Sequence, residues 1–131
     1  MHDPQKAQDE IIGDFSLFDS WLDRYQYLID LGKKLESLDD AEKTDDILLH
    51  GCQSRVWLII EGNADEVIIR ANSDAAIVSG LIALLIRVYS GASARQIINT
   101  QPEFITAIGL QQHLSATRAN GCLLYTSDAA D

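Results

Sequence analysis

One apolar stretch, residues 75–89, limits what this chain can fold into more than any other feature. Its aliphatic side chains occupy nearly every direction around a helical axis: Ile77, Val78, Leu81, Ile82, Leu84, Leu85, Ile86 and Val88. Asn72-Ser73-Asp74 offers N-capping side chains before it, and Gly91 offers a C-terminal stop. A helix that is apolar all round belongs in the centre of a core, so the rest of the chain must cover it.

Two β-branched segments before this helix, residues 56–61 and 66–71, predict two strands. They are joined by Gly62-Asn63-Ala64-Asp65, a turn-forming sequence, so we expect an antiparallel hairpin. An isolated hairpin is only marginally stable, which calls for a third strand or for covering helices. Residues 38–46 are polar and predict a loop, and the short run 47–49 is one candidate for the third strand.

The N-terminal part predicts two helices. Residues 4–12 suit a short helix that ends near Gly13. A second helix is expected to start at Ser16, with Asp19 near a capping-box position, Phe15 packed at its start and Gly32 at its end. Its apolar side chains recur at spacings of three and four and so share one face: Phe18, Trp21, Leu22, Tyr25, Leu28 and Ile29.

The C-terminal part predicts further short helices. Ser93 and Gln96 form a capping box for a helix that reaches Asn99, and Pro102 opens another that Gly109 closes. The resulting order is helix, helix, hairpin, helices. This order is typical of an α+β domain in which a small antiparallel β-sheet packs against several helices.

The charge and length exclude several function classes. The chain has 131 residues, which favours one domain, and a net charge of −10. Such acidity argues against general nucleic-acid binding and against binding to anionic membranes, because both need a cationic surface. Residues 1–10 carry no apolar leader, and the apolar run 75–86 is too short to span a bilayer, so we expect a cytoplasmic protein.

The cysteines and histidines are too few for a disulfide framework or a zinc site. The cysteines are Cys52 and Cys122, and the histidines are residues 2, 50 and 113. Zinc prefers four clustered nitrogen or sulfur ligands, and no Cys-x-x-Cys pair is present. We therefore expect no bound metal.

Cys52 is the strongest candidate for chemistry. It lies where a polar loop enters the first predicted strand, and the preceding Gly51 permits close approach of another protein. His50 and Arg55 place basic groups nearby, and positive neighbours raise the thiolate fraction of a cysteine. By residue type alone, a buried cysteine that acts as a small apolar side chain remains an alternative.

Three motifs in the same order resemble the SufE family. The first is the stretch Gly51-Cys52-Gln53-Ser54-Arg55-Val56-Trp57, which is similar to that family's active-site signature. The second is Ala71-Asn72-Ser73-Asp74-Ala75 followed by the apolar helix, and the third is Leu114-Ser115 with Arg118-Ala119-Asn120-Gly121. The resemblance covers residues 10–121 and implies a fold of the SufE and IscU type.

The resemblance implies a sulfur acceptor and desulfurase activator rather than an enzyme. Cys52 would take persulfide sulfur from a SufS-like cysteine desulfurase and pass it to a SufB-containing scaffold complex for iron–sulfur cluster assembly. No cofactor is expected, because pyridoxal phosphate belongs to the partner desulfurase. Family positions near the site or the partner surface correspond to His50, Gly51, Gln53, Ser54, Asp74, Arg118 and Asn120. Asp74 is also a candidate helix N-cap, Arg118 a surface ion-pair residue and Asn120 a turn residue.

Other functions fit part of the pattern. A CsdE-like protein shares the signature and serves a different, CsdA-like, desulfurase. A free-standing thiol enzyme would act on a small substrate without a desulfurase, and a pure adaptor would not need its cysteine. A cluster scaffold is disfavoured because it needs several cysteine ligands.

The last ten residues, 122–131, do not continue any apolar face. They resemble the translation of a sequencing adapter, so we expect residues 1–121 to form the acceptor domain and the tail to replace a natural C-terminal helix. Loss of that helix would leave part of the core uncovered.

Overall fold

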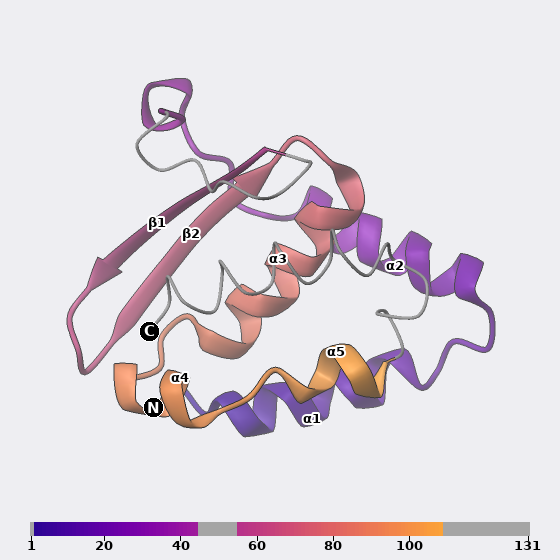
Figure 1. Ribbon diagram of the computed structural model, residues 1–131. Helices are drawn as coiled ribbons and strands as arrows, with labels where there is room; N and C mark the ends of the chain where they lie inside the picture. Colours follow the sequence, from indigo (N-terminus) through magenta and orange to yellow (C-terminus); the bar gives the residue numbers. More distant parts are fainter. Residues whose placement is uncertain (1, 45–54, 109–131) are drawn as a thin grey trace.

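The computed structural model describes residues 2–44 and 55–108. In these residues a two-stranded antiparallel sheet lies against one side of a central helix, and the other helices surround that helix (Figure 1). The elements are α1 (Pro4–Phe15), α2 (Trp21–Lys33), the 3-10 helix η1 (Asp40–Glu42), β1 (Val56–Gly62), β2 (Val67–Ser73), α3 (Ala76–Tyr89), α4 (Ala94–Asn99) and α5 (Glu103–Ala107). The predicted α+β class and the antiparallel hairpin are confirmed.

The hairpin has the register that the turn sequence dictates. Val56 pairs with Ser73 at the open end and Gly62 with Val67 at the turn. Gly62 has φ +87°, and a Cβ atom there would collide with the Glu66 carbonyl oxygen. Asn63 Oδ1 accepts the amide of Glu66 at 3.0 Å, which closes the turn. A side chain at residue 62 is therefore excluded on two grounds, its φ angle and the lack of space.

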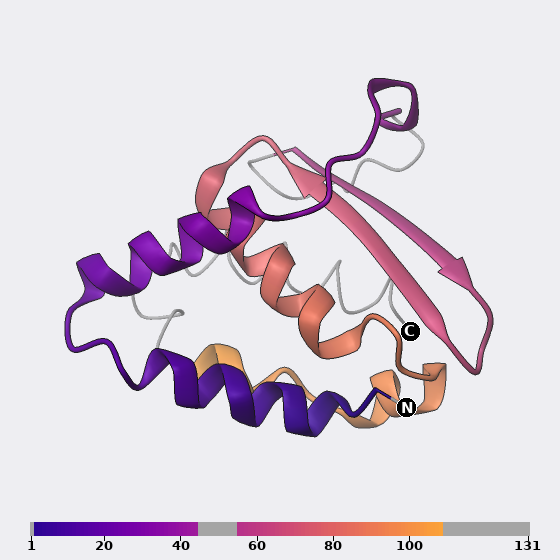
Figure 2. The same ribbon diagram turned by 180° about the vertical axis from the view of Figure 1, so that it is seen from behind.

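Helix α3 lies in the centre of the molecule, as its all-round apolar sequence predicts. Leu84 and Val88 are at most 1% exposed. Gly80 brings α3 directly against the backbone of α2 at Leu28, where a Cβ atom would lie 2.6 Å from Leu28 Cγ. Figure 2 shows α2 and the hairpin on two different sides of α3. The absence of a side chain at Gly80 is what permits this close packing.

A buried polar side chain on α1 binds the backbone of the chain that follows α4. Gln8 on α1 is fully buried. Its Nε2 donates to the Gln101 carbonyl oxygen at 2.9 Å, and its Oε1 accepts the Phe104 amide at 3.0 Å. These bonds satisfy both ends of the amide and fix α5 alongside α1 (Figure 1).

The first two helix boundaries differ from the predicted ones. α1 continues through Gly13 to Phe15, and Ser16 follows it as the C-cap instead of starting the next helix. Ser20 is the N-cap of α2, since its Oγ accepts the Asp23 amide at 3.2 Å. The predicted boundary was wrong because burial of Phe15, which is 1% exposed, extends α1 beyond its local stop signal.

The later boundaries follow the predictions closely. α2 ends at Lys33, one residue after Gly32. The capping box of Ser93 and Gln96 is present at the start of α4. Gly91, at φ +92°, ends the α3 turn and donates its amide to the Val67 carbonyl oxygen at 2.7 Å. The third-strand candidate 47–49 and Gly109 lie outside the described residues.

Among residues 2–44 and 55–108, no single helix is long and apolar enough to cross a membrane. The segments 76–89 and 94–107 reach that length and composition only as a pair bent by 115°.

Candidate functional site

Most of the predicted site residues lie outside the described part of the chain. These are His50, Gly51, Cys52, Gln53, Ser54, Arg118 and Asn120. Of the predicted set, Asp74 is described, together with the last three residues of the cysteine signature, Arg55, Val56 and Trp57. The described part of the candidate site therefore consists of the residues that flank 45–54 on both sides.

Arg55 and Asp74 extend the hairpin at its open end. The Arg55 amide donates to Asp74 Oδ1 at 3.0 Å, and the Asp74 amide donates to the Arg55 carbonyl oxygen at 3.3 Å. This pair is the next rung after Val56 and Ser73. In it a side-chain carboxylate takes the place that a main-chain carbonyl holds in a regular antiparallel ladder. The backbone is thereby fixed to within three residues of Cys52.

The expectation that Asp74 caps α3 was wrong, because the Asp74 carboxylate accepts the Arg55 amide instead. The N-cap residue is Ala75, and no side chain caps it. Ser73 Oγ accepts the Ala75 amide at 3.2 Å, while the Asp74 carboxylate accepts an amide from the other strand. An aspartate before a helix accepts whichever amide the fold brings near, so local pattern could not distinguish the two.

Asn72 holds the chain on the other side of the 45–54 segment. It is 8% exposed, and its Oδ1 accepts the Leu38 amide at 2.6 Å. Its Nδ2 donates to the Glu36 carbonyl oxygen at 2.8 Å and also to that of Ala71. The stretch after α2 is thus attached to β2 by a buried side chain whose polar atoms are all paired.

An ion-pair group continues this attachment along the outer face of the hairpin. Arg70 binds both carboxylate oxygens of Glu42, at 2.9 and 3.0 Å, and contacts Glu61 at 3.1 Å. The hydrogen bond from Arg70 lowers the pKa of Glu42, and the bonds to Glu42 and Glu61 raise the pKa of Arg70. Lys43 Nζ lies 5.4 Å from the centre of the Trp57 ring. Residues 36–43 are therefore fixed across the sheet on the N-terminal side of the cysteine signature.

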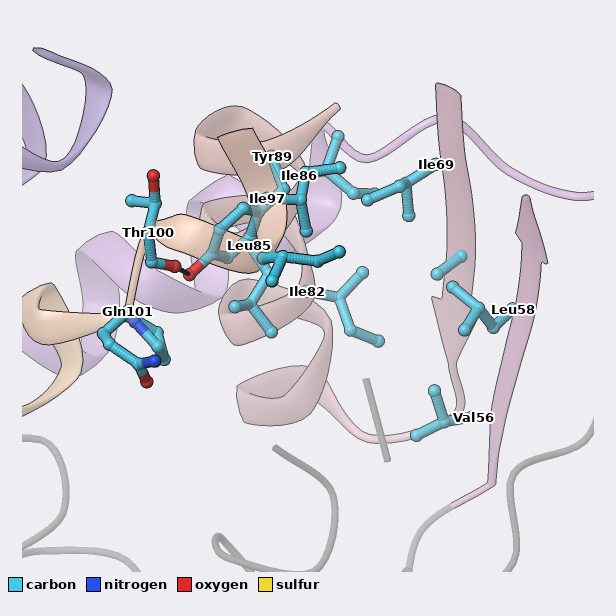
Figure 3. Close-up of a pocket in the computed structure, with 13 residues that line it drawn as sticks. Val56, Leu58, Ile69, Ile82, Leu85, Ile86, Tyr89, Ile97, Thr100 and Gln101 are labelled. Carbon is cyan, nitrogen blue, oxygen red and sulfur yellow. Dashed lines mark hydrogen bonds between the residues drawn. The ribbon is translucent and has the colours of Figure 1, made fainter. Parts of the chain in front are cut away.

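A small apolar pocket of about 80 Å³ lies between the hairpin and α3 (Figure 3). Its wall includes Val56, Leu58 and Ile69 from the strands and Ile82, Leu85 and Tyr89 from α3. The α4–α5 connection closes one side, where Tyr89 Oη donates to the Thr100 carbonyl oxygen at 2.7 Å. No charged side chain of the described chain lines it. Because Val56 belongs to the cysteine signature, the signature itself contributes a residue to the pocket wall.

The sequence did not reveal the roles of Asn72, Arg70 or Glu42. For Asn72 the sequence predicted only a possible N-cap of the helix that follows. The partners of Arg70 lie nine and twenty-eight residues away along the chain. No spacing rule connects residues that far apart. Within residues 2–44 and 55–108, no group of three His, Cys, Asp or Glu side chains is arranged to hold a metal ion.

Comparison with known proteins supports the resemblance. The family model described as SufE, an Fe–S metabolism associated domain, matches residues 9–126. An uncharacterized SufE-like protein of Rhizobium meliloti (strain 1021) is 40% identical over 118 residues, which cover 86% of this chain and 84% of that protein. A second uncharacterized SufE-like protein, from Rhizobium etli, is also 40% identical over 118 residues, which cover 86% of this chain and 80% of that protein.

The fold has a counterpart among solved structures. The solution structure of a hypothetical protein from Thermus thermophilus matches with a TM-score of 0.70 at 20% identity, covering 92% of this chain and 87% of that one. At this identity the match supports the fold alone. SufE proteins are sulfur-transfer and activator proteins that generally work with a cysteine desulfurase. The matched length and the identity to SufE-like relatives show that this chain belongs to the SufE family.

Proposed function

We propose that this protein carries sulfur on Cys52 from a SufS-like cysteine desulfurase to a SufB-containing scaffold that assembles iron–sulfur clusters. It acts as an acceptor and activator, and the pyridoxal-phosphate chemistry is carried out by the desulfurase. The observation that carries the proposal is the Arg55–Asp74 rung, which joins the cysteine signature to the two-stranded sheet in a chain of the SufE family. A functional group on a short connection from a rigid element is well placed for transfer between proteins.

The charge near the signature supports thiol chemistry. Asp74 binds the backbone amide of Arg55 and leaves the guanidinium exposed. Among the described residues, that guanidinium forms no ion pair. A cation within reach of a thiol favours the thiolate, which is the nucleophile in sulfur exchange.

The apolar pocket supports protection of a bound sulfur. Covalent geometry keeps the Cα atom of Cys52 within about 11 Å of that of Arg55. The pocket wall begins at the next residue, Val56, and carries no charged group among the described residues. A persulfide that reaches such a pocket is removed from water and from soluble thiols, which would otherwise reduce it.

The proposed transfer is a thiol exchange. The Cys52 thiolate attacks the terminal sulfur of the desulfurase persulfide, the sulfur–sulfur bond of that persulfide breaks, and the desulfurase cysteine leaves as a thiolate. The product is a persulfide on Cys52, and no net oxidation occurs because the sulfane sulfur only changes its carrier. The scaffold accepts the sulfur by the same exchange.

The test is incubation with a SufS-like desulfurase and cysteine, followed by intact mass measurement and peptide mapping. We expect a gain of one sulfur atom at Cys52 and none in the Cys52→Ser variant. Cys122→Ser is the matched control, and it should be labelled like the wild type. Sulfur found on Cys122 instead, or no sulfur gain with any desulfurase, would contradict the proposal.

A further inference from the structure

Residues 39–43, which we call the strap, lie on the side of the hairpin that is opposite to α3 (Figures 1 and 2). Glu42 binds Arg70 of β2 through both carboxylate oxygens, at 2.9 and 3.0 Å. Lys43 Nζ lies 5.4 Å from the centre of the Trp57 ring on β1. The strap therefore contacts both strands, and through Trp57 it contacts the cysteine signature itself.

The strap and the chain just before it are held in different ways. Leu38 is 4% exposed, and its amide donates to the buried Asn72 side chain at 2.6 Å. The contacts of the strap lie nearer to solvent, since the side chains of Glu42 and Arg70 are 30% and 26% exposed. Ion pairs that water reaches add little stability and weaken with salt. Leu38 is therefore suited to act as a hinge about which the strap turns while the hairpin stays packed.

The strap covers apolar side chains of β1. Val56 and Leu58 are buried in the core, so the alternation along the strand places Trp57 and Ile59 on the outer face. Ile59 pairs with Arg70, which puts the ion pair of the strap beside it. Both Trp57 and Ile59 are half-buried. Aromatic and aliphatic side chains ringed by charged ones are typical of the centre of a protein–protein contact.

A protein that reaches Cys52 must lie against this part of the molecule. Covalent geometry keeps the Cα atoms of Cys52 and Trp57 within about 18 Å of each other. A stable complex covers about 800 Å² on each partner, which corresponds to a patch about 30 Å across. Trp57 and the strap over it therefore fall within or at the edge of the contact area of any protein that exchanges sulfur with Cys52.

We propose that the strap is a cover whose release lets a cysteine desulfurase dock beside Cys52. The inference rests on the proposed function, because it concerns how the sulfur donor gains access to the acceptor. With the strap closed, Glu42 and Lys43 occupy Arg70 and the Trp57 ring, and with the strap released both groups are available to the donor. The apparent affinity for the donor is then reduced to the fraction of molecules in which the strap is released.

The first test measures the strap without a partner. In a Trp21→Phe background, Trp57 is the one remaining tryptophan, and acrylamide quenching of its fluorescence reports how far it is covered. Glu42→Gln removes the charge that Arg70 binds and retains a side chain able to close the capping box of η1. The quenching constant of Trp57 should rise about twofold, because the remaining contact is a neutral hydrogen bond. Circular dichroism checks that each variant keeps the fold.

Two further variants complete the first test. Lys43→Gln takes the ammonium group away from the Trp57 ring, so it should raise the quenching constant in the same way as Glu42→Gln. Asp40→Asn makes the same change of carboxylate to amide at an exposed position of η1 and is the matched control. It should leave the quenching constant at the wild-type value.

The second test measures docking through the initial rate of persulfide formation on Cys52 with a SufS-like desulfurase. The rate is followed against the concentration of this protein. In Glu42→Gln the KM for this protein should fall about twofold while kcat stays constant, since a larger fraction is ready to bind and the chemistry is unaltered. Asp40→Asn should match the wild type in both quantities.

The two tests have separate contrary outcomes. Unchanged quenching in both Glu42→Gln and Lys43→Gln would show that the strap does not cover Trp57 and would overturn the proposal. A KM that stays constant or rises while quenching increases would overturn it as well, because the cover would then not control docking. No sulfur gain at Cys52 in the wild type would contradict the proposed function, and the proposal with it.

Discussion

The Asn72 side chain accepts the Leu38 amide at 2.6 Å and joins two stretches of chain thirty-four residues apart. Replacing Asn72 by Ala leaves the Leu38 amide without a partner in a buried place and removes the part-buried bond to the Glu36 carbonyl. We expect the free energy of unfolding to fall by about 1–3 kcal/mol, measured by urea denaturation. Asn99→Ala, at an exposed position, is the control and should change it by less than about 0.5 kcal/mol. Equal effects of the two substitutions would contradict the bridging role.

Asp74 offers a test that separates positioning from stability. The Asp74→Asn variant keeps an oxygen that accepts the Arg55 amide, whereas Asp74→Ala removes it. If the rung positions the cysteine signature, Asp74→Ala slows sulfur transfer to Cys52 several-fold, while Asp74→Asn retains most of the rate. The measurement is the initial rate of persulfide formation with a saturating desulfurase, alongside Tm for each variant. Equal rates in the two variants would show that the acceptor oxygen at this position is not needed.

Two glycines in helices should respond in opposite directions to the same substitution. A Cβ atom on Gly80 would meet the Leu28 backbone, so Gly80→Ala must separate α3 from α2 and should cost about 1–3 kcal/mol. A Cβ atom on Gly13 would meet nothing within 4 Å, and Gly13→Ala should stabilise α1 by about 0.5–1 kcal/mol. Thermal unfolding of both variants checks this, and a stabilised Gly80→Ala would disprove the close packing.

The contact between Glu42 and Arg70 should make part of the stability depend on pH. The hydrogen bond from Arg70 lowers the pKa of Glu42 from its ordinary value of 4.5. The contribution of this contact is therefore complete above pH 4.5 and is lost as the pH falls through the lowered folded-state pKa. We expect Tm of wild type and Glu42→Gln to converge as the pH is lowered from about 7 to about 3. A constant difference across that range would mean that Glu42 keeps its ordinary pKa.

The elements predicted correctly are those whose signals lie within a few residues. The all-round apolar pattern identified α3, and a turn sequence between β-branched runs identified the hairpin. The capping box placed the start of α4 because Ser93 and Gln96 are three residues apart and bind each other's backbone amides. In each case the atoms that stabilise the element are neighbours in the sequence.

The features that the sequence did not predict depend on contacts between distant segments. α1 continues past Gly13, its predicted end, because Phe15 is buried by residues from elsewhere in the fold. Asp74 binds an amide nineteen residues earlier in place of the helix end that follows it. Gln8 reaches a carbonyl ninety-three residues away. A polar residue in a sequence shows its capacity for hydrogen bonds, and only the fold determines where they go.

The two sides of the cysteine signature are held by different kinds of interaction. On the downstream side, Arg55 continues a sheet ladder whose inner face is packed against the core. On the upstream side, residues 40–43 are held by charged contacts at a solvent-facing surface, where little apolar area is buried. Local opening of native proteins starts where burial is least. Hydrogen exchange should therefore release the amides around Glu42 well before those of β1 that pair with β2, so that the chain detaches upstream of the signature while its downstream end stays in register.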